Sequence, residues 1–123
     1  MRTAVALLFS FALAGAAFAQ VDPKTAMLEQ AGVEALNAGQ ADRAADAFRQ
    51  AILADPKNAR LHLGAGVAAL LQHRDGDAKA ALEHALELQP TLHQARQFLG
   101  QAYYRLGDLQ GAIATYEALA ASP

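Results

Sequence analysis

The sequence predicts an all-α fold built from a repeated pair of helices, and three observations carry that prediction. Hydrophobic residues make up 54% of the 123 residues, and much of that share is alanine, which together with scattered Leu, Glu, Gln and Arg favours helix. No run of alternating β-branched residues indicates a strand. Small and apolar residues also recur with a period of 34, which is typical of stacked structural repeats.

The N-terminal residues carry the pattern of a secretory signal peptide. Arg2 precedes an uncharged apolar stretch at residues 4–14, and Ala17-Phe18-Ala19 is an A-x-A cleavage pattern. We therefore expect residues 1–19 to be removed on export to a bacterial periplasm or the cell exterior, leaving no stable membrane anchor. A membrane-spanning anchor is the alternative, but the uncharged stretch of residues 3–19 is at the short end of the spanning range and rich in alanine.

Four columns of residues share the 34-residue period. They are the glycines Gly32, Gly66 and Gly100, the alanines Ala44, Ala78 and Ala112, the large residues Phe48, Leu82 and Tyr116, and the prolines Pro56 and Pro90. A glycine inside a helix costs about 0.8 to 1.0 kcal/mol relative to alanine, so packing must offset the cost. We predict that the glycines let the two helices of a repeat approach closely, against the alanines.

The elements follow from this period in chain order. Residues 20–24 form a lead-in, in which Asp22-Pro23 has the pattern of an N-cap followed by proline at the first helical position. The predicted repeats then cover residues 25–58, residues 59–92 and residues 93–123, the last of them truncated.

Each repeat contains two amphipathic helices separated by a turn. In the first repeat, Leu28, Ala31, Gly32 and Ala35 line one face of a helix, and Ala44, Phe48, Ala51 and Ile52 line one face of the next. Gly39 and Gly107 lie where the chain reverses, and we predict a left-handed backbone there. His73 occupies this place in the middle repeat, which is tolerable because His is among the residues enriched at positive φ.

These motifs resemble the tetratricopeptide repeat, which has a large apolar residue, Leu/Ala-Gly and Tyr in its first helix, followed by Ala, an aromatic, Ala-Leu and Pro in its second. The last repeat matches best, through Leu99-Gly100, Tyr103, Gly107-Asp108, Ala112 and Tyr116. His62 and Arg96 depart from the pattern at the place of the large first-helix residue. The resemblance implies a right-handed superhelix of three antiparallel helix-turn-helix repeats.

The resemblance also implies a function, because the first helices of tetratricopeptide domains line a concave groove that holds a peptide or a partner's helix. We therefore expect a scaffold for protein–protein interaction. The corresponding groove positions here are Ala26, Glu29, Val33, Leu36, Asn37, Arg60, Leu63, Val67, Leu70, Leu71, Gln94, Gln97, Gln101, Tyr104 and Arg105. The alternative is that the leucines are ordinary core between helices and that the glutamines are merely solvated.

One known mode of tetratricopeptide binding is disfavoured by these residues. The family's clamp for the terminal carboxylate of a chaperone tail uses Lys and Asn, whereas Glu29 and Val33 occupy its first-repeat positions for the cation and the amide. A ligand carboxylate facing Glu29 would meet repulsion. A carboxylate-clamp co-chaperone is therefore not the expected identity.

The last predicted helix carries a second candidate surface. Ile113, Tyr116 and Leu119 lie on the side that a further repeat would cover, and arrays usually end in a polar capping helix. The alternative function is a structural subunit that forms a homo-oligomer or joins an envelope complex through this edge.

Other function classes lack their sequence signals. The formal net charge is −2 with both signs interleaved, and this is not the footprint of a nucleic-acid-binding protein. There is no cysteine, and the sequence contains no Ser/His/Asp order, P-loop or dinucleotide motif, so we expect neither an enzyme nor a cofactor. His62, His73 and His84 form no i, i+3 or i, i+4 pair, so no metal site is expected.

Overall fold

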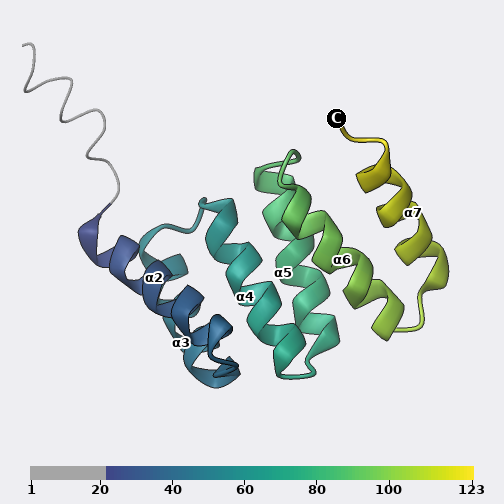
Figure 1. Ribbon diagram of the computed structural model, residues 1–123. Coiled ribbons are helices and arrows are strands. Elements are labelled where there is room, and N and C mark those ends of the chain that lie inside the picture. The colour runs from purple at the N-terminus through teal and green to yellow at the C-terminus, as the bar shows by residue number, and fades with distance from the viewer. Residues whose placement is uncertain (1–21) are drawn as a thin grey trace, which may run out of the picture.

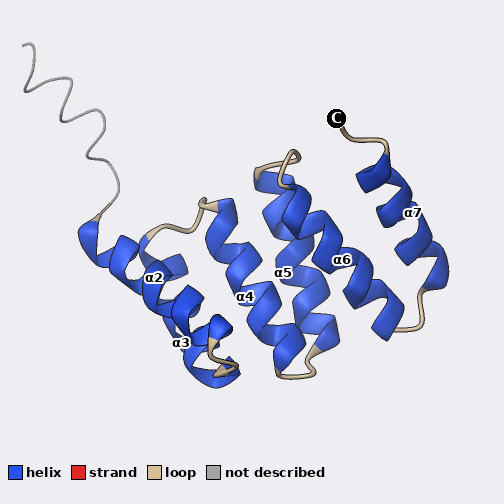
Figure 2. Ribbon diagram, viewed as in Figure 1, coloured by secondary structure: helices blue, strands red, loops and turns tan. Residues whose placement is uncertain are grey.

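The computed structural model describes residues 22–123, and within this range the chain forms six α-helices and no strand (Figures 1 and 2). The helices are α2 (Pro23–Asn37), α3 (Ala41–Ala54), α4 (Ala59–Leu71), α5 (Asp75–Leu88), α6 (His93–Arg105) and α7 (Leu109–Ala120). The predicted all-α fold is confirmed. The predicted signal peptide lies outside the described residues, and within them no helix has the length and apolar character needed to cross a membrane.

Side-chain caps begin three of the helices. The Asp22 carboxylate accepts a hydrogen bond from the Lys24 backbone N–H at 3.2 Å, with Pro23 in the first turn, as the sequence predicts. Asn58 accepts from the Arg60 N–H at 3.1 Å. Asp108 accepts from the Gly111 N–H at 2.9 Å. Each cap satisfies one of the backbone donors that a helix start leaves without an intrahelical partner.

The turns within the three helix pairs share one backbone conformation. Gly39, His73 and Gly107 have φ values of +71°, +59° and +81°, so the predicted left-handed positions are confirmed, including the histidine. At the middle turn, the His73 N–H donates to the Leu70 carbonyl at 3.1 Å and the Arg74 N–H donates to the Ala69 carbonyl at 2.8 Å. This is the Schellman arrangement, which closes a helix by satisfying its last carbonyls.

The helix pairs stack in chain order (Figure 1), and the first helices of the pairs lie on the inner side of the stack. Each helix packs against its neighbours in sequence, and α4 also contacts both α2 and α6. The second helices α3, α5 and α7 do not contact one another. First helices contact one another across the repeats and second helices do not, so the stack curves around the first helices. At the end of the stack, α7 packs against α6 alone.

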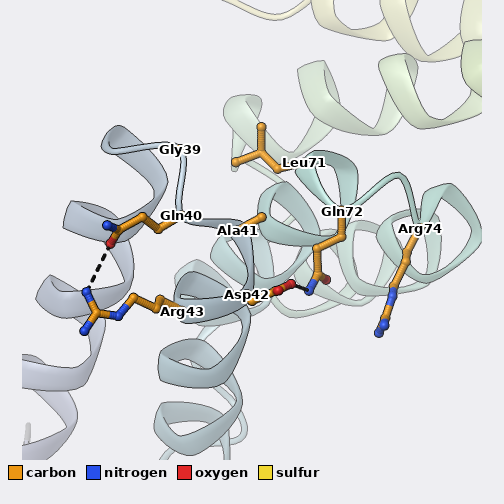
Figure 3. Close-up of a pocket in the computed structure, with 8 residues that line it drawn as sticks. All are labelled: Gly39, Gln40, Ala41, Asp42, Arg43, Leu71, Gln72 and Arg74. Atoms are coloured by element: carbon orange, nitrogen blue, oxygen red, sulfur yellow. Dashed lines mark hydrogen bonds between the residues drawn. The ribbon is translucent and has the colours of Figure 1, made fainter.

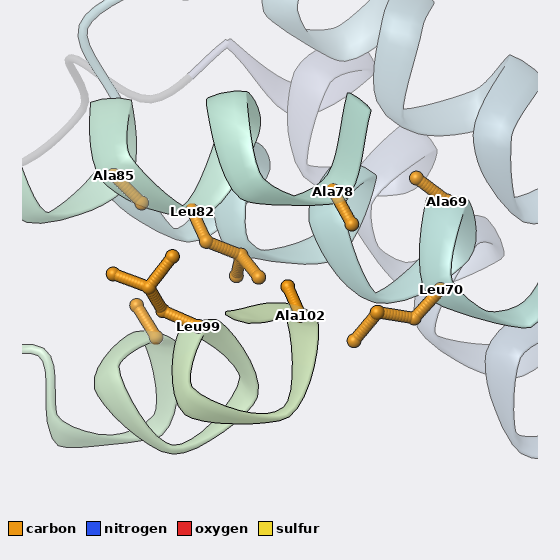
Figure 4. Close-up of a cluster of buried hydrophobic side chains, with 8 residues drawn as sticks. Ala69, Leu70, Ala78, Leu82, Ala85, Leu99 and Ala102 are labelled. Carbon is orange, nitrogen blue, oxygen red and sulfur yellow. The ribbon is translucent and has the colours of Figure 1, made fainter. Parts of the chain in front are cut away.

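The core consists of two clusters, one at each junction between helix pairs. Leu82 and Ala85 of α5 meet Ala95, Leu99 and Ala102 of α6 in the cluster drawn in Figure 4. The other cluster is centred on Phe48 and Leu61, both fully buried, which come from α3 and α4. Alanine and leucine at these positions let the helices approach closely while they bury apolar surface.

The helical glycines allow a close approach, and the large residues of the second helices lie nearest to them. A Cβ added to Gly32 would lie 2.7 Å from Phe48, one added to Gly66 would lie 2.7 Å from Leu82, and one added to Gly100 would lie 2.7 Å from Tyr116. The nearest atoms therefore belong to the large residue of the second helix, and not to the alanine four residues before it. Each large side chain fills the space that the glycine leaves free.

The two departures from the repeat pattern have a common structural role. His62 Nε2 lies 2.7 Å from the Pro56 carbonyl oxygen, and the Arg96 guanidinium donates to the Pro90 carbonyl at 3.0 Å. Both polar side chains therefore reach back to the proline that follows the preceding helix. They hold the connection between helix pairs by a hydrogen bond, where the family pattern uses apolar packing.

Tyr103 connects α6 to α5 through its hydroxyl. The hydroxyl donates to the Glu83 carboxylate at 3.3 Å, and the Lys79 ammonium lies 5.4 Å from the ring centroid. Burial, and after it the negative charge of Glu83, raises the pKa of Tyr103 above its ordinary value of 10.0. The phenol is therefore held in its neutral form, which can donate the hydrogen bond.

Candidate functional site

A groove of about 590 Å³ lies along α2, α4 and α6. Glu29, Val33, Leu36 and Asn37 come from α2. Arg60, Leu63, Gly64, Val67 and Leu71 come from α4, and Gln94 and Phe98 from α6. Leu92, just before α6, and Phe48 of α3 complete the lining. The first helix of each pair therefore contributes to one concave surface.

The surface of the groove is mainly apolar. Val33 and Leu71 are its most exposed large apolar side chains, at 44% and 45%. Leu36, Leu63 and Phe98 are half-buried beside the two core clusters, so their inner sides are fixed by packing. Asn37 and Gln94 supply amide groups that can both donate and accept hydrogen bonds.

The charges in the groove are limited to one ion pair. The Arg60 guanidinium of α4 donates to the Glu29 carboxylate of α2 at 2.6 Å, across the junction between the first two helix pairs. The Glu29 side chain is 20% exposed and the Arg60 side chain 62% exposed, so the pair reaches solvent. No catalytic constellation accompanies it among the groove residues, which include no Ser, Cys, His or Lys.

The structure brings nine of the predicted groove residues together. These are Glu29, Val33, Leu36, Asn37, Arg60, Leu63, Val67, Leu71 and Gln94. Ala26 is exposed on α2 and does not line the groove. The predicted groove position of Leu70 is wrong, because Leu70 is 4% exposed and belongs to the core cluster between α4, α5 and α6. The next residue, Leu71, lines the groove as predicted. One residue along a helix turns the side chain by about 100°, since a turn has 3.6 residues.

Four predicted residues of α6 lie outside the groove lining. Gln97, Gln101 and Tyr104 are exposed on the same helix as Gln94, and Tyr104 is an exposed aromatic side chain. The Arg105 guanidinium donates to the Leu70 carbonyl at 2.8 Å and to the Asp75 carboxylate at 3.3 Å. Arg105 therefore ties the end of α6 to the end of α4 and the start of α5.

Four groove residues were missed by the sequence analysis: Phe48, Gly64, Leu92 and Phe98. Gly64 and Phe98 stand 34 apart, so the repeat period could have placed them in one column once either was assigned to the groove. Phe48 was placed in the core, and it is 1% exposed there, but an edge of its ring also reaches the groove. No signal in the sequence distinguishes these two roles.

A second, polar depression lies beside the turns that follow α2 and α4 (Figure 3). The Gln72 amide donates to the Asp42 carboxylate at 2.8 Å, and the Arg43 guanidinium donates to the Gln40 side chain at 3.4 Å. The first contact joins the end of α4 to the start of α3, and the second lies within the start of α3, so these polar side chains of the lining serve the structure.

The histidines do not assemble a metal centre in the described chain. The His62 and His84 rings pack edge to face with centroids 4.4 Å apart, and His84 Nδ1 lies 3.4 Å from the Glu87 carboxylate. The sequence spacing did not predict this pairing, which arises because α4 and α5 are antiparallel. Within residues 22–123, no group of three or more potential ligands is close enough to hold a metal ion.

The predicted edge lies on α7, at the end of the stack. Ile113 is 57% exposed and Tyr116 is 42% exposed, whereas Leu119 is half-buried. Leu109, one turn before Ile113, is also exposed. Phe48 and Leu82, which stand at the same repeat position as Tyr116, are fully buried under the following helix pair.

Comparison with known proteins identifies the fold and the family. Residues 29–90 and 76–123 match the family model described as "Tetratricopeptide repeat". The chain is 38% identical over 86 residues to the Hsp70-Hsp90 organizing protein of Triticum aestivum. That match covers 70% of this chain, but the chain spans only 15% of that relative's length.

Solved structures of tetratricopeptide domains superpose on most of the chain. The first such domain of Spaghetti (RPAP3), bound to the HSP90 peptide SRMEEVD, matches with a TM-score of 0.77 and 25% identity, over 82% of this chain and 81% of that one. The TPR2B domain of yeast Sti1, in a structure described as a complex with pHsp70, has a TM-score of 0.77 at 20% identity, over 80% of this chain and 78% of that chain. The helix order, the turns and these matches agree, and the chain belongs to the tetratricopeptide repeat family.

Proposed function

We propose that this protein is a non-catalytic interaction scaffold of three repeats that binds a peptide, or a helix of a partner protein, in the groove along α2, α4 and α6. The exposure of Val33 and Leu71 inside this groove carries the proposal. When a partner covers apolar side chains that are exposed in a concave surface, the burial of apolar surface stabilises the complex. The peptide-bound domain of Spaghetti supports this class of function by similarity of fold.

The test compares substitutions inside and outside the groove. Immobilised wild-type protein selects partners from a native envelope extract, and each retained protein is then purified and its Kd is measured. We expect Val33→Asp and Leu71→Asp to weaken binding at least tenfold, because each places a carboxylate where an apolar side chain must be covered. Leu53→Asp is the matched control, since Leu53 is exposed on α3 and does not line the groove. Equal Kd values for wild type and both groove variants would contradict the proposal.

The setting of this function is proposed to be the periplasm or another exported location. The A-x-A pattern at residues 17–19 supports the proposal. N-terminal sequencing of the protein from a periplasmic fraction is expected to begin at Gln20. A protein that retains Met1 and fractionates with the cytoplasm would refute it.

The exposed face of α7 favours a second candidate function, in which the protein works by self-association or by joining an envelope complex. Leu109, Ile113 and Tyr116 are uncovered there. The other end of the stack is less uniformly apolar, because α2 exposes Gln30 and Glu34, whose side chains are hydrogen-bonded at 3.2 Å, as well as Met27. The self-association version of this function pairs two α7 faces.

Sedimentation over micromolar concentrations tests this second function. If the protein self-associates, we expect the wild type to be a dimer and Ile113→Ser to be a monomer. A wild-type protein that remains monomeric over the whole range would exclude self-association. Partner binding that is lost in Ile113→Ser but kept in Val33→Asp would instead place the main contact surface on α7.

A further inference from the structure

We propose that the groove selects an uncharged, apolar segment from within a partner chain and discriminates against acidic C-terminal tails. This inference rests on the proposed function, since it specifies the chemistry of the ligand for the same groove. It is carried by the charges of α2, α4 and α6 and by what each of them contacts.

The cations of the first helices are already engaged. Arg60, the one cation that lines the groove, donates to the Glu29 carboxylate at 2.6 Å. Arg96 donates to the Pro90 carbonyl at 3.0 Å. Arg105 donates to the Leu70 carbonyl and to the Asp75 carboxylate. Lys24, in the first turn of α2, is outside the groove lining. An acidic ligand in the groove would therefore have to share Arg60 with the Glu29 carboxylate.

Glu29 also acts against such a ligand. Its side chain is 20% exposed, so it is only partly screened by solvent, and a ligand carboxylate near Arg60 would lie close to it as well. Like charges at short range disfavour the ionised form of both groups. The formal charges of the groove lining sum to zero, so no excess positive charge compensates for this repulsion.

The remaining contacts suit a neutral segment. Val33 on α2 and Leu71 on α4 offer exposed apolar anchors, and Leu63 and Val67, both half-buried, line the groove from the same helix as Leu71. Asn37 and Gln94 can pair with the backbone N–H and C=O groups of an internal segment. Such groups occur in every peptide, so apolar side chains would provide most of the selectivity.

A peptide-display selection tests this ligand class. Random heptapeptides are displayed in two formats, one with a free C-terminal carboxylate and one as an internal segment, and are selected on the full chain. We expect enrichment in the internal format of sequences rich in apolar residues and poor in Asp and Glu, with retention reduced at least tenfold by Val33→Asp and unchanged by Leu53→Asp. Enrichment of acidic sequences that require a free carboxylate would overturn the inference but leave the proposed function intact. If Val33→Asp reduces the retention of no sequence in either format, the proposed function itself fails.

A second measurement isolates the Arg60–Glu29 pair, with the peptide SRMEEVD as the probe. Glu29→Gln removes the charged partner of Arg60, and we expect affinity for SRMEEVD to rise at least fivefold. Amidation of the peptide's C-terminus should reduce this gain. Glu34→Gln is the matched control, because it changes the net charge equally on the same helix but lies outside this groove. An equal gain in both variants would show a general charge effect and refute the pairing argument, as would tight, carboxylate-dependent binding of SRMEEVD to the wild type.

Discussion

The contact between Phe48 and Gly64 offers the sharpest test of how neighbouring helix pairs fit together. A Cβ added to Gly64 would lie 2.3 Å from two carbons of the Phe48 ring, whereas carbon atoms in favourable contact are about 3.5 to 4.0 Å apart. The ring cannot move away freely, because it is 1% exposed and Gly32 lies against it from its own helix pair. Any side chain at position 64 must therefore displace the ring or the helix.

We expect Gly64→Val to lower the free energy of unfolding by about 2 kcal/mol. Overpacking a well-filled core costs about 1 to 3 kcal/mol, and the upper part of this range applies because the ring is confined on both sides. Replacing a helical glycine with valine returns only a few tenths of a kcal/mol in helix propensity. Since 1 kcal/mol shifts the Tm of a domain of this size by roughly 4 to 8 °C, the expected fall is about 8 to 16 °C.

Thermal and urea unfolding, followed by circular dichroism, measure this effect against a matched control. Gly76→Val makes the same substitution in the first turn of α5, where an added Cβ meets nothing within 4 Å, and a change within about 0.5 kcal/mol is expected. Phe48→Leu should partly rescue Gly64→Val, with a favourable coupling energy of about 1 to 2 kcal/mol in a double-mutant cycle. Equal stability of the two valine variants, or additivity in the cycle, would refute the steric argument.

Three further predictions follow from local contacts. Gly66→Val should destabilise by more than about 1 kcal/mol in urea unfolding, because its Cβ would lie 2.7 Å from Leu82; an unchanged midpoint would contradict this. His73→Gly should raise the free energy of unfolding by about 1 kcal/mol, since an L-residue at φ +59° is strained, and a fall in the urea midpoint would count against this reading. The Tyr103 phenol should titrate above its ordinary pKa, as burial and Glu83 raise it. The stability from this shift is fully present below the unfolded pKa of about 10 and is lost as pH rises through the folded pKa. Ultraviolet pH titration of wild type and Tyr103→Phe tests it, and an unshifted Tyr103 would rule it out.

The repeat period makes much of the fold predictable because the features that define it are local. The turn positions at Gly39 and Gly107 require a left-handed backbone, which few residues adopt easily, so glycine in the right column predicts the turn. Asp22-Pro23 predicts the start of α2 for the same kind of reason, since an N-cap acts on a backbone N–H two residues away. The 34-residue columns then extend these local predictions along the chain.

The sequence also determined the helix that faces the groove, but the tertiary structure decided which of its residues do so. Leu70 and Leu71 are chemically identical neighbours, yet Leu70 is buried by packing against α5 and α6 and Leu71 lines the groove. The position of α5 and α6 relative to α4 decides that Leu70 is buried and that Leu71 faces the groove. The glycine contacts show the same limit, because the period identifies the column of glycines but not the side chain that lies nearest to each of them.

Long-range polar contacts were likewise decided only by the assembled stack. Glu29 and Arg60 are 31 residues apart in sequence, and their pairing depends on the side-by-side arrangement of α2 and α4. The His62 and Arg96 contacts with proline carbonyls depend on how each new helix crosses the preceding connection. Local backbone requirements can be predicted from single residues and short spacings in the sequence. The partner of a long polar side chain is fixed only when packing sets the distance between helices.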